Sequence, residues 1–299
     1  MIAYHSIFVH PLPAGHRFPM LKYELIYEQL QYQGIVEPAQ FFSPDPIENQ
    51  YVFAAHDEAY WNRALSLTLS SAEVRRIGFP LSAELIEREQ RIAEGTRQGA
   101  LYALEEGCAF NIAGGTHHAG YDWGEGFCIL NDQAIAASYL VNEKKLSRIL
   151  IVDVDVHQGN GTANIFEGDD RVFTFSIHCE KNFPFRKERS DLDVGLADGV
   201  SDALYLKQLE EALDRLFEEV KPEFVFYLSG VDVLASDKLG KLKLTMDACK
   251  KRDQMVLGRC KEKGIPVQVS MGGGYSSDIR HIVDAHCQTF KVAADLNLL

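Results

Sequence analysis

An unbroken apolar run in the middle of the chain is followed at once by charged side chains. Residues 149–152 read Ile-Leu-Ile-Val, and Asp153, Asp155 and His157 come next, before a Gly-rich turn. A short apolar run rich in β-branched residues predicts a strand buried on both faces of a parallel sheet, here over residues 148–154. Side chains two apart on a strand point the same way, so the two acids and the imidazole would share one side if the extended backbone persisted. Because unpaired buried carboxylates are costly, a positive group is expected at this strand end, either a basic side chain or a metal ion.

Segments of strand character alternate with helical segments over most of the chain. Apolar runs of strand length are separated by longer segments with the period of an amphipathic helix. This alternation predicts βαβ units and a parallel sheet, and no linker or repeat divides the sequence, so we expect one domain over residues 1–299. The expected strands are 2–9, 109–113, 148–154, 171–177, 224–229 and 266–271, and the expected helices are 20–33, 57–70, 83–106, 132–145, 202–220, 247–263 and 277–296.

Charge and cysteine content narrow the classes of function. The chain has 30 basic and 43 acidic residues and a net charge of −13 at pH 7. That balance argues against direct nucleic-acid binding, which needs a basic face, and is compatible with a basic partner such as a lysine-rich protein tail. No apolar run is long enough to span a membrane, and the first residues lack the pattern of a signal peptide. The six cysteines form no CxxC pair, so we expect reduced thiols and a cytoplasmic protein.

Polar and ionisable residues follow four of the expected strands. His117 and His118 come after the second strand, Asp155 and its neighbours after the third, Asp232 after the fifth and Tyr275 after the last. Each group has a structural explanation when taken alone: a solvated loop, a salt-bridged strand end, a helix cap or a tight turn. However, the carboxyl ends of parallel strands meet at one edge of the sheet, where ligands bind in α/β proteins. Their convergence there favours a shared functional site.

Three of these residues have the side chains of a catalytic metal site. Two carboxylates and an imidazole, from Asp155, Asp232 and His157, suit zinc or ferrous iron and leave a coordination position open for water. A metal of this kind lowers the pKa of its water and polarises a carbonyl oxygen. The sequence therefore predicts metal-dependent hydrolysis of an amide.

The other polar residues at this edge fit the same chemistry. His117 and His118 would move protons, one of them accepting a proton from water and returning it to the leaving amine. Tyr275 could donate its hydroxyl to the developing oxyanion. Asp153 would hydrogen-bond an imidazole and set its basicity. Together they would supply the acid, base and oxyanion donor that amide hydrolysis needs.

Five ordered motifs resemble the histone deacetylase family. They are Gly114-Gly115-Thr116-His117-His118, Gly126-Phe127-Cys128-Ile129-Leu130-Asn131-Asp132, the segment 153–161 that reads Asp-Val-Asp-Val-His-Gln-Gly-Asn-Gly, Gly230-Val231-Asp232 and Gly272-Gly273-Gly274-Tyr275. The resemblance implies the arginase/deacetylase fold, a three-layer α/β/α domain with a central, mostly parallel sheet of eight strands. It also implies a zinc ion on the three ligands named above, with His118 as the principal acid/base, His117 as its electrostatic partner and Tyr275 as the carbonyl-polarising hydroxyl.

Binding of the substrate and of a second ion is also implied by the resemblance. Gly126, Phe127 and Phe183 would line the tunnel that holds the alkyl chain of an acylated lysine. Family members carry a structural potassium ion near the zinc. Its ligands here would be Asp153 and Asp155 with backbone oxygens near His157, Ser176 and Ile177.

One position departs from many family members. Asn160 stands where those proteins have Asp as the partner of the acid/base histidine. A neutral amide stabilises an imidazolium less than a carboxylate does, so His118 should be a weaker base here. The His-Gln-Gly-Asn-Gly sequence, with Lys251-Arg252-Asp253, resembles the class IV branch, which includes enzymes that prefer long fatty-acyl lysine; both acetyl and longer acyl groups therefore stay open. Arg17 either binds the leaving acetate or makes a structural salt bridge.

Three functions are compatible with these features. The first is a zinc-dependent lysine deacylase acting on an acyl-lysine protein or peptide. The second is a hydrolase of acetylpolyamines or other small acylated amines, and the third is a non-catalytic module that binds acyl-lysine. The third would lack a metal ligand, the histidine pair or the tyrosine, and all of these are present. We therefore expect an enzyme.

Overall fold

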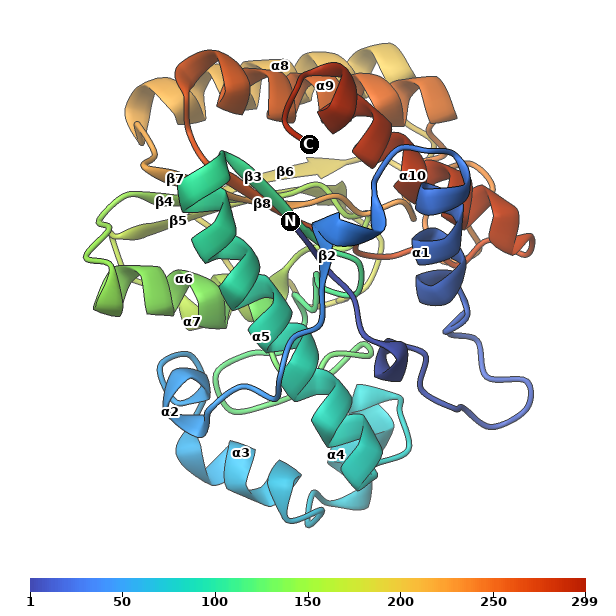
Figure 1. Cartoon of the computed structure of the whole chain (residues 1–299), viewed down its shortest axis with the longest axis vertical. Coiled ribbons are helices and arrows are strands. Elements are labelled where there is room, and N and C mark those ends of the chain that lie inside the picture. Colours follow the sequence, from blue (N-terminus) through green and yellow to red (C-terminus); the bar gives the residue numbers. More distant parts are fainter.

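Eight parallel strands form the central sheet of the computed structural model, which describes residues 1–299 (Figure 1). The strand order is β2-β1-β3-β8-β7-β4-β5-β6, and every neighbouring pair is parallel. Each right-handed βαβ connection places a helix against the sheet, so a parallel sheet of this kind is covered on both faces. The strands are β1 (Ile2–Ala3), β2 (Phe41–Phe42), β3 (Cys108–Asn111), β4 (Ile149–Asp153), β5 (Val172–Cys179), β6 (Leu192–Leu196), β7 (Phe224–Leu228) and β8 (Val267–Ser270).

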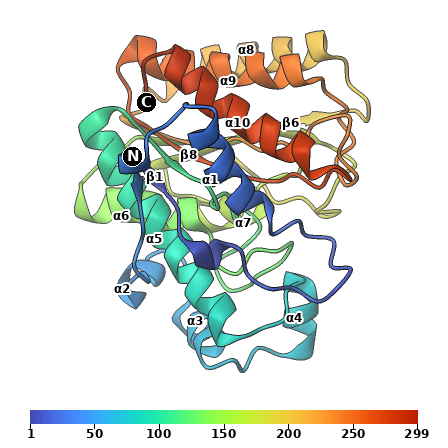
Figure 2. The ribbon, with the colours of Figure 1, turned by 45° about the vertical axis from the view of Figure 1, so that its right-hand side comes forward.

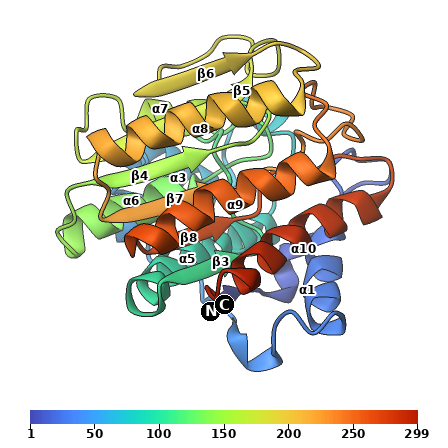
Figure 3. The same cartoon turned by 90° about the horizontal axis from the view of Figure 1, so that it is seen from above.

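The helices cover the sheet in two layers, which confirms the predicted three-layer fold. Figures 1 and 3 show α8, α9 and α10 over one face, with α1 beside α10, and α5, α6 and α7 over the other. Figure 2 shows α2, α3 and α4 grouped outside that second layer, around the end of α5. The helices are α1 (Lys22–Tyr32), α2 (Asn49–Val52), α3 (Glu58–Leu65), α4 (Ser71–Ile77), α5 (Ala83–Glu106), α6 (Asp132–Glu143), α7 (Asn160–Ile165), α8 (Asp202–Glu219), α9 (Met246–Lys263) and α10 (Ile279–Asp295).

Burial along the strands explains why the sequence forms this sheet. Every residue of β3, β4, β7 and β8 is buried, as expected for central strands that helices cover on both faces. The buried apolar residues form one cluster of 79 members that extends from Ile2 to Ala293. We propose on this basis that the whole chain is a single domain. None of the helices is both long and apolar enough to cross a bilayer, and all six cysteines are buried and free.

Several predicted elements differ from the structure. The expected strand at 2–9 ends at Ala3 and is followed by a 3-10 turn. The helix expected over 57–70 is shorter: α3 ends at Leu65, Leu67 has a φ of 59°, and Ser70 caps the next helix, α4, which was not expected. Strands β2 and β6 were not expected. They lie at the two edges of the sheet, where β2 has only two residues and β6 alternates half-buried and exposed side chains before the buried Leu196.

Candidate metal and catalytic site

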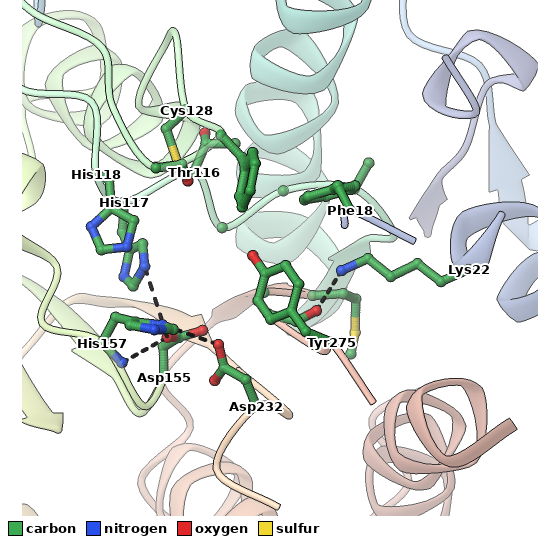
Figure 4. A pocket seen from close by; sticks show the side chains of 18 of the residues that line it. Phe18, Lys22, Thr116, His117, His118, Cys128, Asp155, His157, Asp232 and Tyr275 are labelled. Carbon is green, nitrogen blue, oxygen red and sulfur yellow. Dashed lines mark hydrogen bonds and ion pairs between the residues drawn. The ribbon is translucent and has the colours of Figure 1, made fainter. Parts of the chain in front are cut away.

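The predicted site residues lie at the carboxyl ends of four strands that are consecutive in the sheet. The loop after β3 carries the histidine pair, the loop after β8 carries Tyr275, the loop after β7 carries Asp232, and the loop after β4 carries Asp155 and His157. Figure 4 shows these side chains around one pocket, with the imidazoles on one side and the Tyr275 phenol facing them. The convergence expected from the strand ends is therefore present.

Asp155, His157 and Asp232 form a buried cluster of metal-ligand type. One ligand atom from each of the three residues lies within 4.8 Å of the others. His157 Nδ1 is 3.0 Å from Asp155 Oδ1 and 3.2 Å from Asp232 Oδ2. The extended backbone assumed from the sequence does not persist, because β4 ends at Asp153 and the next residues turn. The backbone N–H of His157 donates to Asp155 Oδ1 at 2.9 Å in that turn, which aims both side chains at the same point.

The surroundings of the cluster fit a divalent cation. Asp232 Oδ2 is buried and accepts no hydrogen bond, although Asp232 Oδ1 accepts one from the Val156 N–H at 3.0 Å. Burial, followed by the negative charge of Asp155, raises the pKa of Asp232 to about 7. A Cβ on Gly273 would lie 2.5 Å from Asp232 Oδ2 and 2.8 Å from Asp155 Oδ2, so only a glycine leaves the space between these carboxylates clear. Two carboxylates and an imidazole form the O,N donor set of zinc and ferrous sites.

The two histidines beside the cluster have different partners. His117 Nδ1 lies 2.6 Å from Asp153 Oδ2, and His118 Nδ1 lies 2.7 Å from Asn160 Oδ1. Burial opposes a charge on His117, but the Asp153 carboxylate outweighs it and raises the pKa of His117 to about 9. Burial, and then the neighbouring imidazoles, hold the pKa of His118 well below its usual range. His117 is therefore the cation of the pair and His118 is the neutral base.

Aromatic rings wall the approach to the cluster. Phe127 packs at 6.0 Å from the Tyr275 ring, and Phe183 lies edge-on to His118 at 5.0 Å between ring centroids. Gly126 has a φ of 57°, and a Cβ there would lie 2.7 Å from His118 Cδ2, so the chain can pass this close to His118 only with a glycine. Burial, and then the carboxylates of the cluster, raise the pKa of the Tyr275 hydroxyl well above its usual range, so this hydroxyl keeps its proton.

The pocket has an inner cavity and an outer groove, and the cations are divided between them. Arg17 lines the outer groove, where its guanidinium lies 5.0 Å from the Phe127 ring centroid and makes no ion pair. The inner cavity contains Lys22 and Arg88 instead. The Lys22 ammonium donates to the Gly273 carbonyl, and burial lowers its pKa to about 8. Arg88 was not expected, because its position in a long amphipathic helix gives no sign that it is buried.

Glu125 is a further residue that sequence reasoning did not single out. Its carboxylate is buried next to Asn160, and Glu125 Oε1 accepts a hydrogen bond from Asn160 Nδ2 at 2.5 Å. No spacing rule links the two residues, which are 35 positions apart. The pair therefore becomes visible only in the folded chain.

Comparison with known proteins places this site in a family. Residues 16–290 match the histone deacetylase domain. The chain is 31% identical over 284 residues to Histone deacetylase 2 of Arabidopsis thaliana, covering 90% of this chain and 72% of that protein. It is also 44% identical to an uncharacterized protein of Picosynechococcus sp., over 99% of this chain and 98% of that protein. The chain belongs to the histone deacetylase family.

Solved structures of the family share the fold. An HDAC homolog from Aquifex aeolicus superposes with a TM-score of 0.84 at 24% identity, covering 98% of this chain and 83% of that one. The same values hold for an HDAC homolog complexed with SAHA. The HDA15 HD domain superposes with a TM-score of 0.82 at 21% identity, covering 98% of this chain and 90% of that one. This member of the histone deacetylase family thus has the predicted arginase/deacetylase architecture.

Proposed function

We propose that this protein is a metal-dependent deacylase that removes an acyl group from the ε-nitrogen of lysine. The observation that carries the proposal is the buried Asp155, His157 and Asp232 cluster, with an imidazole pair on one side and a protonated phenol opposite. The match to the histone deacetylase family supports the same reaction class. The second substrate class considered from the sequence, a small acylated amine, uses the same chemistry and is separated from the first by assay.

The three residues of the cluster would hold the metal ion, zinc or ferrous iron. When bound, such an ion supplies an acidified water and polarises the amide carbonyl. Asp155 and Asp232 provide two negative charges, so the site with one divalent cation is close to neutral. The remaining residues then have to move protons and stabilise charge around the reacting carbonyl.

His118 is the residue placed to act as the base. Its Nδ1 is occupied by Asn160 Oδ1, which leaves Nε2 to accept the proton of the attacking water. The same proton then passes from His118 to the amine as the carbon–nitrogen bond breaks, giving a carboxylate and a free lysine. His117, held as a cation by Asp153, stabilises the negative charge that develops beside it.

Tyr275 and the aromatic walls would bind the two ends of the reacting group. The phenol keeps its proton, and Figure 4 shows its hydroxyl pointing into the space beside the cluster, where it can donate to the carbonyl oxygen. Phe127 and Phe183 would enclose the alkyl chain of the lysine. The inner cavity measures about 40 Å³ against about 400 Å³ for the outer groove, which favours a short acyl group such as acetyl. We further propose that Asp153 sets the basicity of His117, that a structural potassium ion binds near the metal, and that the protein is cytoplasmic and belongs to the class IV branch.

The proposal is tested by turnover of three substrates with defined metal content. Metal-stripped protein is reloaded with zinc or with ferrous iron and given an acetyl-lysine peptide, a myristoyl-lysine peptide and acetylspermidine. We expect release of acetate and free lysine from the first peptide, slower turnover of the second, and loss of both after chelation. Equal activity in metal-stripped protein, or no turnover of any substrate after reloading, would contradict the proposed function.

A further inference from the structure

The outer groove that leads to the cluster is lined by cations and by no acid. Four of its 13 lining residues are basic, namely Arg17, Arg76, Lys181 and Lys241. The same groove is lined by His118, His157 and Tyr275, so it is continuous with the candidate site. Whatever carries the acylated amine must therefore occupy this groove while the amide reacts.

These cations stand out against the charge of the whole chain, which is −13. Arg17, Lys181 and Lys241 are exposed, and none of them makes an ion pair with a carboxylate. Lys241 Nζ donates to the backbone carbonyl of Lys181 at 3.1 Å, so these two basic residues are neighbours in the lining of the groove. A lysine-rich tail or a polyamine would bring like charges to this opening, whereas carboxylates beside the acylated amine would neutralise it.

We propose that the natural substrate is an acyl-lysine flanked by acidic residues. The inference rests on the proposed deacylase function and specifies its substrate class. It also replaces the basic partner that net charge alone suggested, because the total charge does not reveal that the mouth of the site is positive. Exposed charges act mainly on encounter and orientation, so the preference should appear in kcat/KM and should weaken as salt screens it.

Three acetyl-lysine peptides test the proposal with the metal-loaded protein. They differ only in the two residues on each side of the acetyl-lysine, which are Asp, Gln or Lys. At low salt we expect kcat/KM to be about 10-fold higher for the acidic than for the basic peptide, the scale of a few exposed ion pairs. In 0.5 M NaCl the ratio should fall to about 2-fold, because salt at this concentration screens exposed charges that lie more than a few ångströms apart.

Charge reversal in the groove gives the matched variant. K181E/K241E should reverse the order of kcat/KM for the acidic and basic peptides. K144E lies between α6 and β4, at the amino ends of the strands and away from the groove, and should leave that order unchanged. Equal kcat/KM for all three peptides, or a preference for the basic one, would overturn the inference while leaving the deacylase function intact. Absence of turnover of every peptide would reject the deacylase function itself, so the two failures are distinguishable.

A second inference comes from the buried partner of Asn160. Glu125 Oε1 accepts from Asn160 Nδ2 at 2.5 Å, and Glu125 Oε2 accepts from Arg76 Nε at 2.7 Å. An ionised carboxylate has no hydrogen to donate, so it holds the NH₂ side of the Asn160 amide towards itself. The amide oxygen must then face His118, at 2.7 Å from Nδ1.

We infer that Glu125 is a positioning residue for the reaction. By orienting the Asn160 amide it fixes the proton of His118 on Nδ1, which leaves the lone pair of Nε2 free to accept a proton in the pocket. A reversed amide would present NH₂ to Nδ1 and place the proton on Nε2, where it blocks the base. The Glu125–Asn160 pair thus fixes both the orientation and the tautomer of His118.

Exchanging the acid and the amide between positions 125 and 160 tests this role in the metal-loaded protein. E125Q would keep its oxygen on Arg76 and offer NH₂ to Asn160, which reverses the amide, so kcat should fall at least ~100-fold with little change in KM. N160D alone would place two carboxylates together and should also fall at least ~100-fold. E125Q/N160D restores every donor–acceptor pair and moves the negative charge from position 125 to position 160. Its kcat should return to within about 10-fold of the natural protein.

The control is a glutamate of similar burial outside the site. Glu94 pairs with Arg97 on α5, so E94Q removes a buried ion pair but should keep kcat within about 2-fold. If E125Q unfolds cooperatively on heating and keeps its kcat within about 3-fold of the natural protein, the inference is overturned. A double variant no more active than either single variant would overturn it as well, because a purely structural role predicts no rescue.

Discussion

Asp232→Asn should abolish turnover and at the same time make the metal-free protein more stable. Asp232 is one of only three ligand side chains in the cluster. Replacing a residue that merely hydrogen-bonds a metal ligand typically lowers metal affinity or activity by ~10- to 100-fold, and losing a ligand itself should lower them further. We therefore expect kcat/KM to fall at least ~1,000-fold even with added zinc. Dialysed variant protein should retain far less than one equivalent of metal by elemental analysis.

The gain in stability has a separate cause. In the metal-free protein, burial and the charge of Asp155 raise the pKa of Asp232 to about 7, so folding becomes less favourable as the pH rises from the ordinary carboxyl pKa towards that value. The amide in Asp232→Asn has no charge to bury, and it can donate to Asp155. At pH 8 the metal-free variant should be more stable than the metal-free natural protein by ~1–3 kcal/mol.

Urea unfolding with and without zinc separates these two effects. Zinc should stabilise the natural protein and leave Asp232→Asn unchanged, because only a bound ligand shifts the folding equilibrium. Asp253→Asn is the control, since Asp253 is an equally buried carboxylate that pairs with Arg252 and accepts from Tyr227 of β7 but is not in the cluster. That variant should lose stability and keep its zinc. Retention of full zinc affinity in Asp232→Asn would remove Asp232 from the ligand set.

The positions of the site residues could be predicted because two simple rules act together. The alternation of strands and helices fixes a parallel sheet, and a parallel sheet brings all strand ends to one edge. The loops after β3, β4, β7 and β8 therefore lie at one edge of the sheet, and they meet because these four strands are neighbours, an order that the two rules do not specify. The central strands were also visible from their apolar runs, whereas the short β2 beside two prolines and the half-exposed β6 carry no such signal.

The sequence could not reveal features that depend on which side chains meet after folding. The Asn160 amide was interpreted as a weaker partner for His118 than a carboxylate, and the buried Glu125 behind it was not foreseen. Net charge was compatible with a basic partner, but it contains no information on where the charges lie. The structure gathers four basic residues at the groove, one from α4 and three from loops that are distant in the sequence.

Tyr275→Phe should lower kcat by ~100- to 1,000-fold, the usual cost of one oxyanion donor, while KM stays within a few-fold. The phenylalanine keeps the ring contacts with Phe18 and Phe127, so only the hydroxyl is lost. The backbone N–H of residue 275 would still donate to Asp237 Oδ2 at 2.6 Å, which holds the loop in place. Zinc content and the urea midpoint should therefore match those of the natural protein. Tyr139→Phe, on α6 where the ring packs against Tyr51, is the matched control and should keep full kcat. If kcat of Tyr275→Phe stayed within about 3-fold, charge stabilisation at the carbonyl would have to come from His117 and the metal site alone.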